Sequence, residues 1–308
     1  MSTFDRAKVA AALQELADRG VWIGTSSWKY DGWLGQVYTG ERYATRGRFS
    51  RKRFETTCLG EYAETFPIVC GDFSFYQFPS EDYWRRLFGS APADLLYAFK
   101  VPEQITAKTF PAHARYGARA GEPNERFLDA ALFKDAFLRP LEAYRRQVAV
   151  LIFEFGTFSR KSYAQLRDFL AELDRFLGEI PGDFRYSVEI RNPELLRPEY
   201  FDCLRGHGVA HVFNAWTRMP ELSAQIGIPE AFTADFSVTR ALLRRGRTYE
   251  QAVTRFSPYQ QAQEPHPEAR EALRAVISRS VAARQAAFIF VNNRLEGNAP
   301  QTIEALIE

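Results

Sequence analysis

The stretch YSVEIRNPELL, residues 186–196, sets Glu189 and Arg191 two positions apart inside an apolar run. Side chains alternate across a β-strand, so these two residues would share one face and leave the apolar residues on the other. The Asn-Pro that follows ends the strand. Because a buried charge without a partner is costly, this polar face is either solvated or lines a site where charges pair or meet a ligand.

Other strand-like runs also end in polar residues: Lys100, Glu154, Asn214, Asn292 and Asn293. Two carboxylates beside a lysine can perform general acid–base chemistry once their surroundings separate their pKa values. An arginine can hold a carboxylate or a phosphate through two parallel hydrogen bonds. Asparagines offer donors and acceptors to sugar hydroxyls or amides. These residue types predict a site for a small anionic or polyhydroxylated substrate that contains a sugar or a phosphate.

We expect Glu189 to serve as general acid or base, with Lys100 and Glu154 assisting it. The residues expected to bind substrate share a place at or after the strand ends: Arg191, Asn292, Asn293, Tyr76, Trp28, Asn214 and Arg240. Trp28 would either stack a ring or pack as a lid against the fold. The expected activity is metal-independent, that of a hydrolase, a lyase or an isomerase.

The elements that would position these residues alternate between strand and helix. Eight strand-like runs occur, at 21–26, 68–76, 95–102, 148–156, 184–191, 209–214, 232–237 and 286–293. Helical patterns such as 162–180 and 267–283 lie between them, which favours a parallel sheet. Eight strands in 308 residues predict one closed (β/α)8 TIM barrel rather than an open sheet. In such barrels the active site lies at the C-terminal ends of the strands, where all these polar residues would meet.

The predicted domain is a single barrel over residues 1–308, with an N-terminal helix over 1–20 capped by Ser2 and the barrel over 21–308. Long loops are expected after strands one, three and seven, and long ordered loops in barrels often carry function. Neither GxGxxG nor GxxxxGK[ST] occurs, which weakens a dinucleotide-binding or P-loop interpretation.

Composition limits the partners. The net charge of +2 favours neither nucleic acid nor membranes, and no apolar run approaches the ~18 residues needed to span a bilayer. The three cysteines form no CxxC pair, and no signal peptide is recognisable, so we expect reduced thiols and a cytoplasmic protein. The oligomeric state is left open.

Three alternatives stay open. A divalent metal could bind the carboxylates of Asp72, Glu154, Glu189 and Asp235, although no cofactor is expected. The segments RYATRGRFSRKRF (42–54) and RALLRRGRTY (240–249) interleave basic and aromatic residues, a pattern suited to binding or hydrolysing nucleic acid. A barrel can also bind a ligand without catalysis, because fold alone does not determine function.

Six stretches, in this order, carry a family resemblance: IGTSSWKYDGW, CGDFSFYQFPS, YAFKVPEQIT, LIFEFGTF, VEIRNPELL and FIFVNN. Across nearly its full length the chain resembles the DUF72 family, also called YecE-like proteins. The resemblance implies a TIM-barrel fold, but it implies no particular reaction, because the family has no assigned activity. It carries over the positions Trp28, Tyr76, Lys100, Glu189, Arg191, Asn292 and Asn293.

The chain departs from the family pattern at four positions. Cys70 replaces an acidic residue, which puts any role of that acid in doubt, and Asp72 replaces an asparagine. Glu154 stands in place of a glutamine and Asn192 in place of a histidine. The stretch RALLRRGRTYEQAVTRFSPY suggests a divergent subgroup with a basic loop after strand seven.

Overall fold

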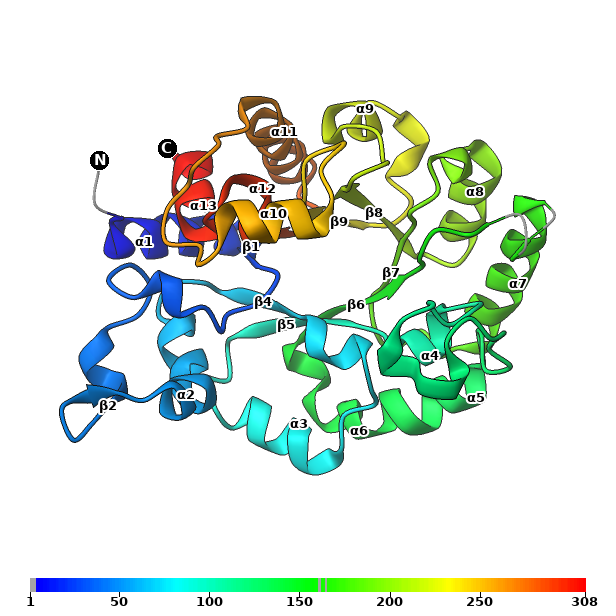
Figure 1. Cartoon of the computed structure of the whole chain (residues 1–308). Coiled ribbons are helices and arrows are strands. Elements are labelled where there is room, and N and C mark those ends of the chain that lie inside the picture. Colours follow the sequence, from blue (N-terminus) through cyan, green and yellow to red (C-terminus); the bar gives the residue numbers. More distant parts are fainter. Residues whose placement is uncertain (1–3, 160–161, 164) are drawn as a thin grey trace.

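The computed structural model describes residues 4–159, 162–163 and 165–308, and within them eight parallel strands close into a barrel (Figure 1). Around the barrel the strands follow the order β1-β10-β9-β8-β7-β6-β5-β4, and β4 pairs back with β1. Their bounds are β1 Val21–Thr25, β4 Ile68–Gly71, β5 Leu96–Lys100, β6 Val148–Glu154, β7 Tyr186–Glu189, β8 Ala210–Ala215, β9 Phe236–Ala241 and β10 Ala286–Val291. The predicted TIM barrel is therefore confirmed.

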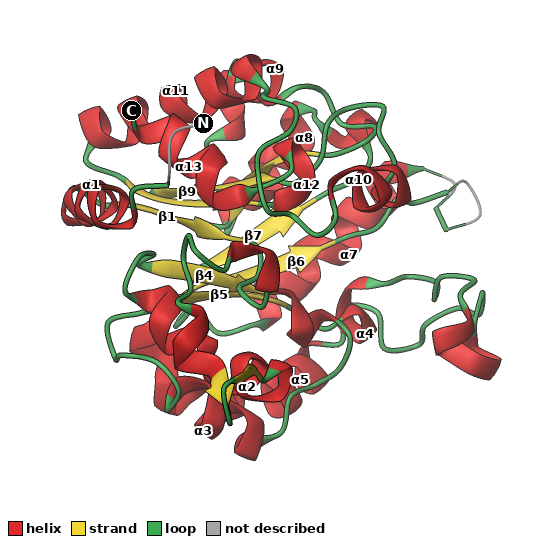
Figure 2. Cartoon of the chain, turned by 60° about the vertical axis from the view of Figure 1, so that its left-hand side comes forward, coloured by secondary structure: helices red, strands yellow, loops and turns green. Residues whose placement is uncertain are grey.

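Helices surround the strands, as both cartoon views show (Figures 1 and 2). Their bounds are α1 Arg6–Asp18, α2 Arg51–Ala63, α3 Glu81–Phe88, α4 Glu103–Thr106, α5 Ala130–Phe133, α6 Arg139–Leu141, α7 Leu166–Glu179, α8 Pro198–Gly206, α9 Leu222–Ile226, α10 Tyr249–Phe256, α11 Pro267–Ala283, α12 Asn293–Glu296 and α13 Ala299–Ile307. The predicted N-terminal helix is α1, where Asp5 accepts a hydrogen bond from the Lys8 N–H. The expected cap Ser2 lies outside the described residues. None of the described helices is long and apolar enough to cross a membrane.

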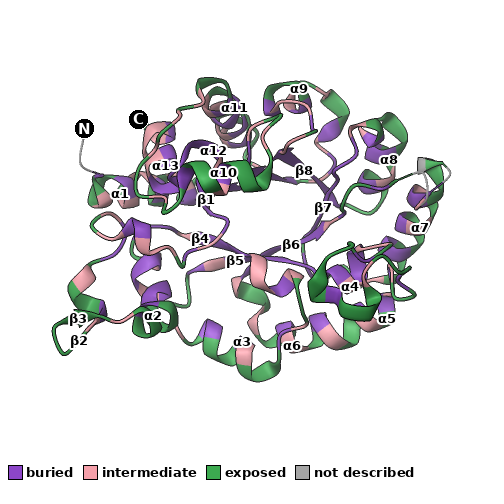
Figure 3. Ribbon diagram, viewed as in Figure 1, coloured by how far each residue is buried: buried purple, intermediate pink, exposed green. Residues whose placement is uncertain are grey.

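The inner faces of the strands divide the barrel into an apolar body and a polar mouth. Val150 and Ile152 on β6, and Val238 on β9, belong to an interior apolar cluster. One step further along the same faces stand Glu154 and Arg240 at the C-terminal ends. Figure 3 shows the strands as a buried layer beneath helices whose outer sides are exposed. The predicted alternation of residues 186–191 holds, since Val188 and Ile190 pack in the outer core.

The seventh strand lies elsewhere than expected. The prediction of 232–237 is wrong, because β9 begins and ends four residues later, at Phe236 and Ala241. The hydroxyl of Thr233 donates to the Val209 carbonyl and accepts from a backbone N–H of β8, so the polar segment before Phe236 is already bonded there. Asp235 consequently precedes the strand and is exposed at its N-terminal end.

Long connections follow β1, β5 and β9, as expected. The first carries a two-stranded hairpin, β2 (Ala44–Thr45) with β3 (Arg48–Phe49). The second carries α4, and the segment after α4 extends away from the barrel (Figure 2). The third carries α10 and the bend that returns the chain to α11. The second predicted strand is shorter than expected, because a 3-10 turn over Asp72–Phe75 replaces its last residues.

Candidate functional site

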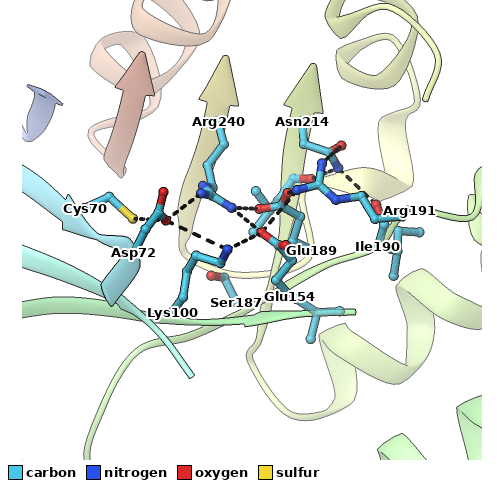
Figure 4. Close-up of polar contacts among 12 residues, drawn as sticks. Cys70, Asp72, Lys100, Glu154, Ser187, Glu189, Ile190, Arg191, Asn214 and Arg240 are labelled. Carbon is cyan, nitrogen blue, oxygen red and sulfur yellow. Dashed lines mark hydrogen bonds and ion pairs between the residues drawn. The ribbon is translucent and has the colours of Figure 1, made fainter. Parts of the chain in front are cut away.

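Six charged side chains meet at the C-terminal end of the barrel, and we call them the mouth cluster (Figure 4). Three are carboxylates and three are cations: Asp72, Glu154, Glu189, Lys100, Arg191 and Arg240. Each comes from the end of a strand or from the turn directly after it. Five of the six, all but Asp72, are buried or nearly so. The formal charges of all six cancel, so the ions compensate one another.

Glu154 lies at the centre of the mouth cluster. Its Oε2 atom is 3.0 Å from Lys100 Nζ, 3.1 Å from Arg191 Nη2 and 2.8 Å from Arg240 Nη1. Three cations therefore converge on one carboxylate oxygen. Short contacts between an ionised donor and an ionised acceptor are the stronger class of hydrogen bond.

Arg240 connects the two sides of the mouth cluster. Its Nη1 atom donates to Glu154 and to Glu189, and its Nη2 atom donates to Asp72 Oδ1 at 3.1 Å. Glu189 is fully buried and also forms an ion pair with Arg191. Glu189 thus forms ion pairs with both arginines and fixes their positions.

Arg191 is oriented by neutral neighbours as well. Its Nη1 atom donates to Asn214 Oδ1 at 3.3 Å, and its guanidinium stacks 4.0 Å from the ring centre of Trp216. The amide of Asn214 donates to the carbonyls of Ile190 and Val212. The arginine plane is fixed between an aromatic face and an amide that is itself fixed by the backbone.

The cluster sets the charge states of its members. Burial alone would raise the pKa of Glu154, but the positive charges of Lys100, Arg191 and Arg240 hold it well below the ordinary value. Burial would lower the pKa of Lys100, yet Glu154 and Asp72 raise it. At neutral pH the site therefore presents an ionised carboxylate beside a protonated amine.

Only part of the cluster reaches solvent. The side chain of Glu154 is 15% exposed and that of Asp72 is 30% exposed, whereas Glu189 has no exposure. A cleft of about 430 Å³ opens beside Glu154, between the loops that follow β5 and β6. Other residues on its wall include Phe75, Lys108, Arg115 and Thr157. Glu154 is the member of the mouth cluster that lines this cleft.

Four of the residues expected to bind substrate lie apart from the mouth cluster. Trp28 is buried edge-on against Phe73, and Tyr76 is 57% exposed with the guanidinium of Arg115 over its ring. Asn292 caps α12 by accepting from the Arg294 N–H. Asn293 Oδ1 accepts hydrogen bonds from the Trp33 indole and the Ala299 N–H. The other six expected site residues, namely Lys100, Glu154, Glu189, Arg191, Asn214 and Arg240, are brought together (Figure 4).

Two contributors to the site were not selected from the sequence. Asp72 was considered only as a metal ligand, and Phe75, whose ring centre is 3.9 Å from Lys100 Nζ, was not considered. The stretch DFSFY that follows the second strand contains both, but the 3-10 turn that brings them to the mouth has no distinctive sequence pattern. Trp216, two residues after Asn214, is a third contributor without a predicted role, since its ring lies against the guanidinium of Arg191.

The structure also bears on the two alternatives of a metal site and of nucleic-acid binding. Among the described residues, no group of three or more His, Cys, Asp or Glu side chains could hold a metal ion. The carboxylates of the mouth cluster face cations instead, and Asp235 lies at the opposite end of its strand. In the basic segment 240–249, Arg244 donates to backbone carbonyls and Arg247 pairs with Glu264.

The family model and two solved structures indicate the same family. The model of the family described as "Protein of unknown function DUF72" matches residues 22–308. A crystal structure of a DUF72 family protein from Thermotoga maritima MSB8 is similar, with 19% identity, a TM-score of 0.61, and 93% of this chain and 97% of that chain covered. A DUF72 family protein from Enterococcus faecalis V583 is also similar, with 14% identity, a TM-score of 0.58, and coverage of 93% and 95%. No curated protein matches the sequence.

Proposed function

The chain belongs to the DUF72 family of proteins of unknown function, and from its barrel mouth we propose that it is a metal-independent acid–base enzyme. Its substrate would be a small anionic or polyhydroxylated molecule that enters the cleft beside Glu154. One observation carries the proposal: the central carboxylate of a six-ion cluster also forms part of the wall of a cleft. Buried ions with perturbed pKa values in a cleft are typical of functional sites.

The geometry favours particular roles. Glu154 is ionised and reaches the cleft, so it suits the general base once it is separated from the cations that lower its pKa. Lys100 is protonated beside it and suits the role of acid or of stabilising negative charge that develops on the substrate. Arg191 and Arg240 would hold an anionic group. Glu189, which is fully buried, suits the positioning of the two arginines better than direct contact with substrate.

The test is a binding and turnover screen on purified protein, with sugar phosphates, hydroxy acids and dicarboxylates in the panel. A ligand at ~100 times its Kd adds roughly 2.7 kcal/mol, which raises Tm by several degrees. We expect this rise in the wild type and in Arg119→Ala, and its loss in Arg191→Ala. Arg119 is a matched control, because it is an exposed arginine over the ring of Phe110.

Two results would contradict the proposal. A rise in Tm that survives in Arg191→Ala would put the ligand elsewhere, and tight binding without turnover of any panel member would favour a non-catalytic ligand-binding protein. Turnover that depends on Arg191 would support the enzyme.

A second candidate function rests on the β2–β3 hairpin. Arg46, Arg48 and Lys52 are exposed and form no ion pair with a described residue, and Phe49 beside them is 42% exposed. Such an arrangement suits phosphate contacts with stacking, and binding of short RNA or DNA should then weaken steeply with salt. Loss of that binding in Arg48→Ser/Phe49→Ser, with Arg119→Ser as control, would support nucleic-acid binding. Binding that is absent, or unaffected by salt, would exclude it.

A further inference from the structure

The three cations of the mouth cluster are arranged around a point, and that point is occupied by a side chain of the protein. Lys100 Nζ, Arg191 Nη2 and Arg240 Nη1 all lie within 3.1 Å of Glu154 Oε2 (Figure 4). Arg240 donates a hydrogen bond to this oxygen, and Lys100 and Arg191 form ion pairs with it. An ammonium and two guanidinium groups gathered around one oxygen are the kind of cations that hold a carboxylate or phosphate oxygen in a binding site. The carboxylate of Glu154 therefore occupies the place that an oxyanion of a ligand would take.

The remainder of the cluster stays paired without Glu154. Glu189 still contacts Arg191 and Arg240, and Asp72 still contacts Arg240 at 3.1 Å. Three cations would then face two carboxylates, which leaves one net positive charge and three cationic groups around the vacated point. A buried excess charge of this kind requires an anion.

Of the two carboxylates Glu154 and Glu189, Glu154 is the one whose side chain can move away from the three cations. Its side chain forms part of the cleft wall, and Gly156 follows two residues later at the same cleft. Glu189, by contrast, has no exposure and has an arginine on each of its oxygens. Rotation of Glu154 into the cleft would therefore open the three-cation point from the solvent side.

We propose that the position of Glu154 Oε2 is the binding site for an oxyanion group of the substrate, a carboxylate or a phosphate, and that Glu154 is its internal competitor. This inference rests on the proposed function for the place of the substrate. An entering oxyanion takes over the donors of Lys100, Arg191 and Arg240. The displaced carboxylate then stands free beside the bound substrate and can accept a proton from a substrate hydroxyl or from water. The O–H bond of that donor breaks, its electron pair stays on the donor oxygen, and a new O–H bond forms on Glu154.

The test measures binding of inorganic phosphate and of malonate by calorimetry at pH 7.5, so that the two arms distinguish phosphate from carboxylate. We compare the wild type with Glu154→Gln, Glu154→Ala and Asp72→Asn. Asp72→Asn is the matched control, because it removes the same charge from the same cluster and leaves Glu154 on its three cations. We expect binding about tenfold tighter or more in both Glu154 variants, since a competitor and a like charge are gone. In Asp72→Asn the gain should be a few-fold at most.

Location is tested by adding Arg191→Ala to Glu154→Gln. The double variant should lose the gain in affinity, since one of the three donors is missing. Equal gains in Glu154→Gln and Asp72→Asn would overturn the inference in favour of a general charge effect. No gain in either Glu154 variant, with folding verified by circular dichroism, would overturn it as well.

A measurement on the unaltered protein guards against variants that fail to fold. Sulfate keeps its charge over this range, and its affinity for the wild type should rise as pH falls from 7.5 to 5. Displacement separates Glu154 from the cations that lower its pKa and leaves it beside an anion, so the carboxylate takes up a proton in the complex that it does not hold in the free protein. The ionisable groups facing Glu154 are those of the mouth cluster, with Glu103, Lys108 and Arg115 on the cleft wall. The rise should persist in Asp72→Asn and vanish in Glu154→Gln. A rise that Glu154→Gln retains would contradict the inference.

These outcomes separate the inference from the proposed function. Tighter oxyanion binding in the Glu154 variants, with no turnover of any substrate by the wild type, would support the oxyanion site and contradict the proposed enzymatic activity. Turnover by the wild type without tighter binding in the variants would support the enzymatic activity and contradict the oxyanion site.

Discussion

Two glutamates of this barrel, Glu296 and Glu154, contact arginines in different ways. Glu296 accepts from Arg270 Nε at 2.9 Å and from its Nη2, and also from the His266 N–H and the Thr302 hydroxyl. Both of its oxygens have partners, and it ties α12 to α11 and α13. Glu154 instead concentrates three cations on one oxygen beside a cleft. The first arrangement satisfies a carboxylate, whereas the second gathers more positive charge than one carboxylate oxygen requires.

This difference separates a structural ion pair from a candidate binding site. A carboxylate held by one bidentate arginine and neutral donors fixes neighbouring elements and leaves nothing for a ligand. Cations that share one oxygen at a solvent boundary can exchange it for another. Exposure agrees with this difference, since Glu296 is fully buried and the side chain of Glu154 is 15% exposed at the cleft.

The largest effect should come from Arg240→Met, which breaks the ion pairs that connect the mouth cluster. Asp72, Glu154 and Glu189 would lose their shared cation, and uncompensated buried charge costs about 3–5 kcal/mol. Urea unfolding at pH 7 measures the loss, and ligand binding should be lost too. A loss below about 1 kcal/mol would mean that water already compensates these carboxylates.

Glu296→Gln should lower stability without affecting ligand binding, because Glu296 forms a structural ion pair away from the mouth cluster. We expect it to cost about 1.5–3 kcal/mol, the usual value of hydrogen bonds to a charged group, because Arg270 keeps only part of its bidentate contact. Binding of any mouth ligand should be unchanged after correction for the folded fraction. An altered Kd would show that the two glutamates are not independent.

Asn214→Ala should have a smaller effect on both properties. It removes the acceptor at 3.3 Å that orients Arg191 and the two bonds to neighbouring carbonyls. We expect about 1–3 kcal/mol in unfolding free energy and a few-fold weaker ligand binding. Equal loss in the double variant Asn214→Ala/Arg191→Ala and in Arg191→Ala would confirm that Asn214 acts through the arginine.

The smallest expected effect is on the pH dependence of stability. Because the cations hold the pKa of Glu154 well below that of an unfolded glutamate, its contribution is present above about pH 4.3 and lost as pH falls toward its folded pKa. The difference in unfolding free energy between the wild type and Glu154→Gln should therefore be constant from pH 6 to 7.5. It should shrink below pH 4.3, and a difference that grows on acidification would have the wrong sign.

Much of this site followed from the sequence because strand alternation and barrel topology are local and repetitive. The face shared by Glu189 and Arg191, and the convergence of Lys100, Glu154 and Arg240, required only a period of two and parallel strands that end at one rim. Arg240 was expected after the strand and lies within it, yet its long side chain still reaches the rim.

The rest depended on contacts between distant parts of the chain. Asn214 lies near the end of β8 and Asn293 lies two residues after the end of β10, but the carboxamide of Asn293 is used by Trp33, 260 residues earlier in the chain. Whether a polar residue at a rim faces the axis or closes a loop is decided by such partners. The displaced start of β9 has the same origin, because the hydroxyl of Thr233 bonds to a neighbouring element. Strand propensity does not contain this information.

The most direct test of the mouth as the ligand site is fluorine NMR of protein labelled with 5-fluorotryptophan. Trp216 stacks on Arg191 at the mouth, and Trp84 is buried in the outer core against Phe99. Trp216→Phe and Trp84→Phe assign the two resonances. Addition of a ligand found in the binding screen should shift the Trp216 resonance and leave that of Trp84 in place. An unchanged Trp216 resonance under saturating ligand would contradict the account.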